Sequence, residues 1–343
     1  MTVTERHLDR LAYAHDASHF ALVPRSVIVP ADVTEVAALL KETRRAVTFR
    51  SGGTSLSGQG VTDDQLADTR RHFRAIQVHD DGATVSAQPG ATVRQVNTRL
   101  FRYGRRLGPD PASEIACTVG GVVANNSSGM LCGTTENTYR TLESATLVLP
   151  SGTVLDTAHP DAHQLLLDRE PDIHHGLLEL RDRIRGDAES VRTIQRLWSI
   201  KNTVGYGLNS FLDFDRPLDI LLRLVVGSEG TLAFVAEATF RTVALRAPTW
   251  PRRCWSSPIS PPPPRCCRTW STRVSPPSSC WTPPASGSPS ATRKRPPTCC
   301  DSTSTGTPRS WWSFRRPPPS PWPIGWPAWW LCSTVCRWSP RRR

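Results

Sequence analysis

The first stretch whose residue types could do chemistry is residues 51–60, which read SGGTSLSGQG. Four glycines and four serine or threonine residues fall within these ten positions. Glycines allow consecutive backbone N–H groups to converge on one anion without Cβ clashes, and the hydroxyl groups add further donors. The composition therefore predicts a pyrophosphate-binding loop, and the alternative is a plain Gly/Ser-rich turn without a ligand.

Two well-known phosphate loops fit this stretch poorly. Gly53 to Gly58 matches the first half of a Walker A motif, but Gln59 stands where the motif requires a lysine. No G-x-G-x-x-G fingerprint opens a helix here either. An ATPase and an NAD-type Rossmann site are therefore disfavoured, and a phosphate-loop nucleotide-binding module without flavin is the weakest alternative.

A second group of residues, 109–113 (PDPAS) and 117–129 (CTVGGVVANNSSG), is hard to explain by packing. Small residues and side-chain amides leave little apolar surface to bury, and they offer many hydrogen-bonding groups to a flat, polar ligand. This group is the second candidate binding segment.

The glycine loop is positioned by a helix and a strand that precede it. Asp32 and Glu35 form a capping-box pattern, and apolar residues at helical spacing follow, so we expect a helix over 33–45. A strand over 46–50 runs directly into the loop. A further helix begins after Pro89-Gly90 and is closed by Gly104.

Turn residues predict three strand pairs: 76–79 with 83–87, 145–149 with 153–156, and 221–226 with 232–236. The last pair flanks the sequence GSEGT at 227–231. One early β-α-β piece followed by hairpins indicates an α+β fold.

At these segments the chain resembles the FAD-binding oxidoreductases of the vanillyl-alcohol oxidase and p-cresol methylhydroxylase family. Within that family it is similar to the branch of D-lactate dehydrogenases and glycolate oxidase flavin subunits. The matching stretches occur in the family's order at 16–18, 30–36, 51–59, 109–113, 118–129 and 227–232. The resemblance implies a two-subdomain α+β domain with FAD between the subdomains, and an FAD-linked enzyme that dehydrogenates a 2-hydroxy acid of the D-lactate or glycolate type.

The resemblance also implies roles for individual residues. The loop would wrap the pyrophosphate, the segments near 110 and 120 would line the flavin and ribityl region, and Glu229 with Gly230 would close the site. The implied FAD-binding residues are Ser51, Gly52, Gly53, Thr54, Ser55, Leu56, Ser57, Gly58, Gln59, Pro109, Ser113, Thr118, Gly120, Gly121, Asn125, Ser127, Gly129, Glu229 and Gly230. Thr54 stands where covalently flavinylated relatives have a histidine, so binding should be noncovalent. Lys201, Asn202 and Tyr206 are candidates for facing substrate, and a loop without chemistry is the alternative there.

The resemblance stops before a substrate or cap domain. Relatives of this branch carry a histidine-rich segment of the form H-x-G-D-G-N-x-H, whereas the last histidine here is His175. No general base can therefore be assigned. This leaves a second interpretation of the chain, a truncated, catalytically incomplete FAD-binding fragment. The electron acceptor, whether a quinone, a cytochrome or an iron–sulfur protein, is not indicated.

Composition changes abruptly near residue 248. Residues 248–343 hold 22 of the 31 prolines and 8 of the 10 cysteines, with 14 Arg, one Lys and one Asp. Their net charge of +14 exceeds the whole-chain value of +12, which leaves −2 for residues 1–247. We expect an N-terminal helical lead-in over 1–19, an FAD-binding domain over 20–247, and a tail over 248–343. The tail is interpreted either as a disordered Pro-rich extension or as the product of a shifted reading frame.

Several partners are disfavoured by the same composition. The basic excess is confined to a stretch without periodic pattern, so a nucleic-acid partner is not expected. The cysteine pairs at 266–267 and 299–300 lack the C-x2-C spacing of a metal site, so no metal is expected. No run reaches the length of a membrane span and no secretion signal is visible, which favours the cytoplasm and leaves open membrane association through an electron acceptor.

Overall fold

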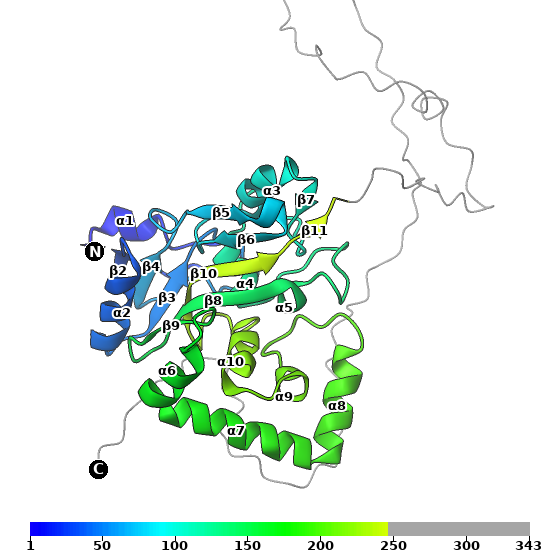
Figure 1. Cartoon of the computed structure of the whole chain (residues 1–343). Coiled ribbons are helices and arrows are strands. Elements are labelled where there is room, and N and C mark those ends of the chain that lie inside the picture. The colour runs from blue at the N-terminus through cyan, green and yellow to red at the C-terminus, as the bar shows by residue number, and fades with distance from the viewer. Residues whose placement is uncertain (246–343) are drawn as a thin grey trace, which may run out of the picture. The chain divides into compact units, whose positions relative to one another are not determined.

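The structure is a computed structural model that describes residues 1–245 of the chain. These residues belong to one compact unit of mixed helix and sheet with two separate main sheets, which is an α+β fold (Figure 1). The predicted tail over 248–343 lies outside the described residues.

The N-terminal sheet contains four strands in the order β1-β2-β4-β3, formed by Thr2–Thr4, Ser26–Val29, Gln65–Asp68 and Val47–Arg50. β2 and β3 both run parallel to β4, which lies between them, whereas β1 is antiparallel to β2. Helix α2 (Val33–Glu42) connects β2 to β3. The predicted cap is present, since the Asp32 carboxylate accepts from the backbone N–H of Glu35 at 2.9 Å. The Glu35 carboxylate in turn accepts from the N–H of Ala31 at 2.7 Å.

The second sheet is antiparallel and has five strands in the order β5-β6-β10-β8-β9. They are Ile76–His79, Thr84–Ala87, Phe234–Arg241, Leu142–Val148 and Val154–Asp156. The two predicted hairpins over 76–87 and 145–156 are confirmed as β5 with β6 and β8 with β9. The last strand in sequence, β10, lies in the centre of the sheet between β6 and β8. A two-stranded pair, β7 (Arg105–Arg106) with β11 (Val243–Ala244), extends this region.

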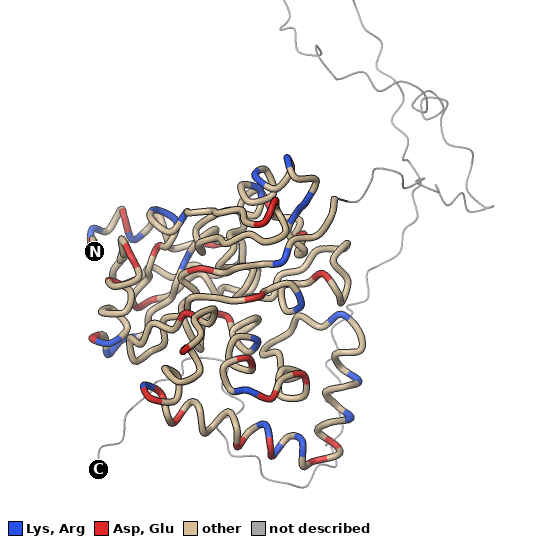
Figure 2. Tube along the Cα trace, in the orientation of Figure 1, with Lys and Arg blue, Asp and Glu red and all other residues tan. Residues whose placement is uncertain are grey.

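Helices pack around the second sheet (Figure 1). α3 (Val93–Phe101) contacts β5 and β7, and α4 (Val119–Asn125) contacts β10. A further group comprises α6 (Ala162–Arg169), α7 (Pro171–Gly186), α8 (Ala188–Trp198), α9 (Ser210–Asp213) and α10 (Pro217–Val225), and the short α5 spans Thr138–Thr141. Charged residues of both signs gather in the C-terminal half of α7 (Figure 2). The buried residues of this helix are His174 and Leu177.

A small apolar cluster joins the two sheets. Phe49 on β3 stacks on Phe234 of β10 with ring centroids 4.5 Å apart, and Phe73 meets the same ring edge-on at 5.4 Å. Val36 of α2 and Val148 of β8 complete the cluster, and both are buried. Such aromatic and aliphatic contacts fix the position of β3, and therefore of the loop that follows it, relative to the second sheet.

Two expectations from the sequence were wrong in part. Residues 221–226 do not form a strand, because all but the last belong to helix α10. The run 221–226 is too short and too apolar to show a period by itself. Over the whole helix the two polar residues, Asp219 and Arg223, are four positions apart, and this helical spacing and Pro217 at the first turn are the signals that were missed. The segment 1–19 contains a helix, α1 (His7–Leu11), but also strand β1, which adds an edge to the first sheet.

Candidate FAD-binding site

The glycine loop leaves the end of β3 with an array of free backbone donors. The N–H groups of Gly52, Gly53 and Thr54 donate to no acceptor within residues 1–245. Gly53 and Gly58 adopt φ values of +63° and +83°, which turn successive N–H groups in ways that a residue with a Cβ rarely allows. The loop thus offers neutral donors without any acidic side chain, as an anionic group requires.

Arg50, the last residue of β3, holds this loop and the N-terminal segment together. Its guanidinium donates to the carbonyl oxygens of Tyr13 at 3.1 Å, Gly60 at 3.2 Å and His15 at 2.5 Å. Burial lowers the pKa of Arg50, although Asp16 opposes this effect. Asp16 also accepts from the N–H of Gly60 at 3.3 Å, so both ends of the loop are tied to residues 13–16.

The second segment begins against the glycine loop. The Thr118 hydroxyl donates to Ser51 Oγ at 2.7 Å. A Cβ built on Gly52 would lie 2.3 Å from the carbonyl oxygen of Ala116, so only glycine allows the two backbones to approach this closely. The two predicted binding segments therefore meet directly.

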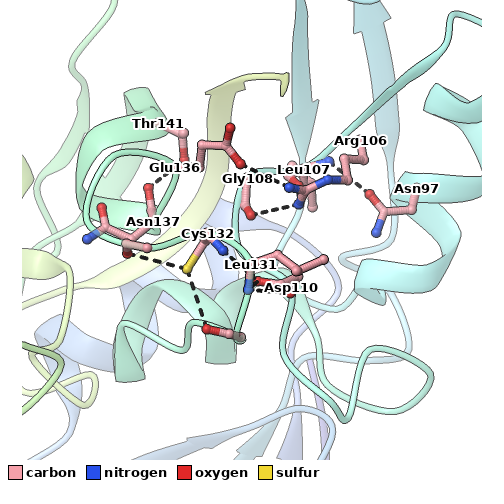
Figure 3. Close-up of polar contacts among 12 residues, drawn as sticks. Asn97, Arg106, Leu107, Gly108, Asp110, Leu131, Cys132, Glu136, Asn137 and Thr141 are labelled. Atoms are coloured by element: carbon pink, nitrogen blue, oxygen red, sulfur yellow. Dashed lines mark hydrogen bonds and ion pairs between the residues drawn. The ribbon is translucent and has the colours of Figure 1, made fainter. Parts of the chain in front are cut away.

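The turn over 109–113 packs against the other end of the second segment. A Cβ on Gly129 would lie 1.7 Å from the Asp110 carbonyl oxygen. The Asp110 carboxylate accepts from the backbone N–H groups of Leu131 at 3.1 Å and Cys132 at 3.2 Å (Figure 3). Burial raises the pKa of the Cys132 thiol, which favours its neutral form. These bonds hold Gly129 and the residues that follow it in a fixed position, and we call residues 129–132 together with Asp110 the Gly129 wall.

Figure 3 also shows a second network, centred on Arg106, in the residues that lead into the turn at 109–113. The Arg106 guanidinium donates to the carbonyl oxygens of Leu107 and Gly108 and forms an ion pair with Glu136 at 2.9 Å. The N–H of Leu107 donates to Asn97 Oδ1 at 2.9 Å. Residues 106–108, which lead into the turn at 109–113, are thereby bonded to α3 through Asn97 and to the segment before α5 through Glu136.

The GSEGT loop closes onto the C-terminal end of α4. Asn125 Nδ2 donates to Glu229 Oε1 at 2.7 Å, and the Ser127 hydroxyl donates to Asn125 Oδ1 at 2.7 Å. The backbone N–H of Glu229 donates to the carbonyl oxygen of Ala124 at 2.8 Å. Burial raises the pKa of Glu229, and the bond from Asn125 opposes the shift. Glu229 has φ +53°, a left-handed conformation that these bonds hold in place.

The predicted substrate-side residues Lys201 and Tyr206 contact the second segment and the GSEGT loop. Lys201 Nζ donates to the Gly129 carbonyl oxygen at 2.5 Å, and the Tyr206 hydroxyl lies 2.7 Å from Thr231 Oγ1. Asn202 is turned back on its own loop, because its Oδ1 accepts from the N–H of Val204 at 3.1 Å.

Two polar atoms in these loops are shielded from water and have no partner within residues 1–245: Asn126 Oδ1 and Ser228 Oγ. Buried polar groups without hydrogen bonds are costly, so such atoms point to a bound group that satisfies them. Together with the free N–H groups of the glycine loop, they form a donor and acceptor set suited to a long, polar cofactor with an anionic middle.

Residues 24–158 match the family model described as "FAD binding domain". This stretch therefore has the sequence of an FAD-binding domain. The match begins before β2, includes the glycine loop and the second segment, and ends after β9. The glycine loop carries neither histidine nor cysteine, so it offers no side chain of these two kinds for a covalent bond to a flavin.

Relatives with this domain are oxidoreductases by name. A D-2-hydroxyglutarate dehydrogenase of Haemophilus influenzae is 26% identical over 250 residues, 69% of this chain and 24% of that protein. A D-lactate dehydrogenase of Archaeoglobus fulgidus is 28% identical over 242 residues, 67% of this chain and 42% of that protein. The glycolate oxidase subunit GlcD of Escherichia coli is 30% identical over 114 residues, 32% of this chain and 23% of that subunit. The chain thus spans between about a quarter and two fifths of the length of these relatives.

Two solved structures are similar to part of the chain. A chitooligosaccharide oxidase gives a TM-score of 0.47 with 17% identity, covering 71% of this chain and 41% of that chain. An alkyldihydroxyacetonephosphate synthase gives a TM-score of 0.46 with 18% identity, covering 71% and 38%.

The structure brings the glycine loop, the second segment, the turn at 109–113 and the loops around 201 and 229 into one connected group. Contacts run from 51–52 to 116–118, from 110 to 129–132, from 125 to 229, and from 129 to 201. Two residues that organise these loops were missed as members of the site. Arg50 was signalled by its position between a strand and a glycine loop, and Asp110 by its place between two prolines.

Two further features concern only the described part of the chain. Among residues 1–245 no group of three or more His, Cys, Asp or Glu side chains is arranged to hold a metal ion. No helix within the same residues is both long and apolar enough to cross a membrane.

Proposed function

We propose that residues 20–247 form an FAD-binding domain and that the protein uses FAD to dehydrogenate a 2-hydroxy acid of the D-lactate or glycolate type. One observation carries the proposal: five loops distant in sequence meet at one place and leave neutral hydrogen-bonding groups unpaired there. The names of the relatives support the substrate class.

The residue roles follow the contacts. Residues 51–59 bind the pyrophosphate through backbone N–H groups and hydroxyls, because the N–H groups of Gly52, Gly53 and Thr54 are unpaired at the end of β3. Pro109, Ser113 and the 118–129 segment line the flavin and ribityl region. Glu229 and Gly230 close the site, since Glu229 is bonded to Asn125. Lys201, Asn202 and Tyr206 lie on the substrate side.

Bound FAD supplies the redox chemistry, as the acceptor of a hydride equivalent from the hydroxyl-bearing carbon of the substrate. The protein's own residues bind and orient the cofactor. Gly129 and the residues bonded around it would border the flavin, and the hydrogen bond from Asn125 to Glu229 would hold the two loops together around it. The electrons then pass to an acceptor, a quinone, a cytochrome or an iron–sulfur protein.

The test is the visible spectrum of the purified full chain after incubation with FAD and removal of free cofactor. We expect bound-flavin absorbance that is bleached anaerobically by D-lactate, glycolate or D-2-hydroxyglutarate. Flavin that binds but is reduced by none of these acids would instead support the interpretation as a catalytically incomplete FAD-binding fragment. Absence of flavin binding would contradict the proposal as a whole.

The domain limits have their own test. A chain that ends at residue 247 should bind FAD with the same dissociation constant as the full chain. A loss of affinity on removing residues 248–343 would show that the domain extends beyond the proposed limit.

A further inference from the structure

The segment 201–206 bridges the two loops that enclose the proposed flavin end of the site. At one end Lys201 Nζ is bonded to the Gly129 carbonyl oxygen at 2.5 Å. At the other end the Tyr206 hydroxyl lies 2.7 Å from Thr231 Oγ1. Close to that end, a Cβ built on Gly227 would lie 2.5 Å from the Gly205 carbonyl oxygen. The ammonium group is therefore held at the rim of the site by contacts on both sides of the segment.

Lys201 is a cation without a fixed counter-charge. No carboxylate lies within 4.0 Å of its ammonium group in the described residues. The neighbouring acids are engaged elsewhere, since Asp110 accepts from the N–H groups of residues 131 and 132, and Glu229 accepts from Asn125. An ammonium group has three donor hydrogens, and the bond to Gly129 uses one of them.

The surroundings of Lys201 suit an incoming carboxylate. The residue is exposed, so an anion can reach it. Two apolar side chains of the same segment are also exposed, Ile200 by 68% and Val204 by 84%. Apolar groups beside an ion pair displace water and strengthen the pair.

We infer that Lys201 binds the carboxylate of the 2-hydroxy acid and so sets the preference for acids over neutral alcohols. The inference rests on the proposed function. In every 2-hydroxy acid the carboxylate is bonded directly to the carbon that is oxidised, so an anchor for this group must lie at the flavin end. The Gly129 carbonyl fixes the ammonium there, and its remaining donors are free to bind a carboxylate oxygen.

The test compares the FAD-loaded full chain with its Lys201→Met and Lys201→Arg variants. Oxalate serves as a carboxylate probe that cannot donate a hydride, and its binding is followed by the change in the flavin spectrum. D-Lactate and its neutral amide serve as a matched pair for anaerobic flavin reduction. Lys41→Met is the control, because Lys41 lies in the last turn of α2.

We expect Lys201→Met to weaken oxalate binding roughly 10–100-fold, the range for losing one charge-assisted hydrogen bond. The half-saturating D-lactate concentration should rise similarly, with little change for D-lactamide. Lys201→Arg should restore part of the oxalate affinity, and FAD affinity should stay constant in all variants.

Three outcomes would overturn the inference. If wild type responds to oxalate and D-lactate and Lys201→Met responds equally, the inference is wrong and the proposed function stands. If Lys201→Met loses FAD affinity to the same extent as oxalate affinity, the lysine supports the Gly129 loop and does not bind substrate. If wild type binds FAD but responds to no acid, the proposed function fails together with the inference.

Discussion

Asn125 Nδ2 donates to Glu229 Oε1 at 2.7 Å, which links two residues that are 104 positions apart in sequence. The bond fixes which way the Asn125 amide faces, because its Oδ1 is then left to accept from Ser127. The Glu229 carboxylate thus determines which hydrogen-bonding groups the Asn125 side chain presents at the C-terminal end of α4.

The first prediction concerns that carboxylate. Glu229→Ala should weaken FAD binding about tenfold, because Asn125 loses its partner and the loop loses a charge-assisted bond. Glu229→Gln keeps an acceptor oxygen and should lose less. Titration of each variant with FAD, followed by flavin fluorescence, measures the effect. Glu179→Ala on the exposed face of α7 is the control, and equal affinities in Glu229→Ala and wild type would contradict the assigned role.

Arg50 should be among the most sensitive residues of the FAD-binding domain. Arg50→Ala removes donors to three carbonyl oxygens, and we expect the free energy of unfolding to fall by roughly 2–3 kcal/mol and FAD affinity to fall with it. Urea denaturation with and without FAD measures both. Arg45→Ala offers the comparison, since Arg45 forms one 3.4 Å ion pair at the surface and should change stability by less than about 1 kcal/mol. If Arg50→Ala and Arg45→Ala lowered the free energy of unfolding equally, Arg50 would not have the stabilising role proposed for it.

Two glycine-to-alanine substitutions should have opposite effects. Gly129→Ala places a Cβ 1.7 Å from the Asp110 carbonyl oxygen, so the wall must open and we expect loss of FAD binding and lower stability. Gly176→Ala lies within helix α7 with nothing within 4 Å, and it should raise stability by roughly 0.5–1 kcal/mol. Thermal unfolding of both variants measures the difference. A Gly129→Ala protein that binds FAD normally would disprove the close approach.

Acidification should destabilise the folded protein through protonation of His174 on α7. Its side chain is buried, both ring nitrogens have no partner in the described residues, and the rings of His163 and His175 lie 5.2 Å and 5.3 Å away. Burial and these neighbours lower the pKa of His174 below its usual 6.5. The unfolded state therefore binds the proton more readily, so stability is fully present above about pH 6.5 and falls as the pH drops below it.

His174→Leu should remove this part of the acid dependence. Urea midpoints measured between about pH 7.5 and pH 5.5 should fall less for the variant than for wild type. His159→Gln, which changes an exposed histidine, should keep the wild-type slope. An unchanged slope in His174→Leu would assign the effect to other groups.

Local signals allowed much of this fold to be predicted from sequence. The Asp32 cap, the strand before the glycine loop and the two confirmed hairpins depend on residues close to one another in the chain, and each leaves a pattern of turn or cap residues. Helix α10 was mistaken for a strand because the prediction considered only the apolar run 221–226, which leaves out Pro217 and the helical spacing of Asp219 and Arg223.

The candidate site was predictable as a set of segments and not as a set of contacts. Glycine density and side-chain amides identified the loops, but the bond from Lys201 to Gly129 spans 72 positions and that from Arg50 to Tyr13 spans 37. No spacing in the sequence encodes such pairs. They depend on how the two sheets meet, for example at the stacked rings of Phe49 and Phe234.

The central place of β10 in the second sheet has a consequence for how the chain folds. β6 and β8 are both made long before β10, yet each pairs with it, and the Ser86 and Thr239 hydroxyls that meet at 2.8 Å are 153 positions apart. Pairing between residues so distant in sequence is slow, because the loop must close before the contacts form. The first sheet needs only residues 2–68 and can assemble while the chain is still being synthesised. The second sheet must wait for residue 241, so until then β6 and β8 have unpaired edges, and this interval is when the nascent chain most needs protection from aggregation.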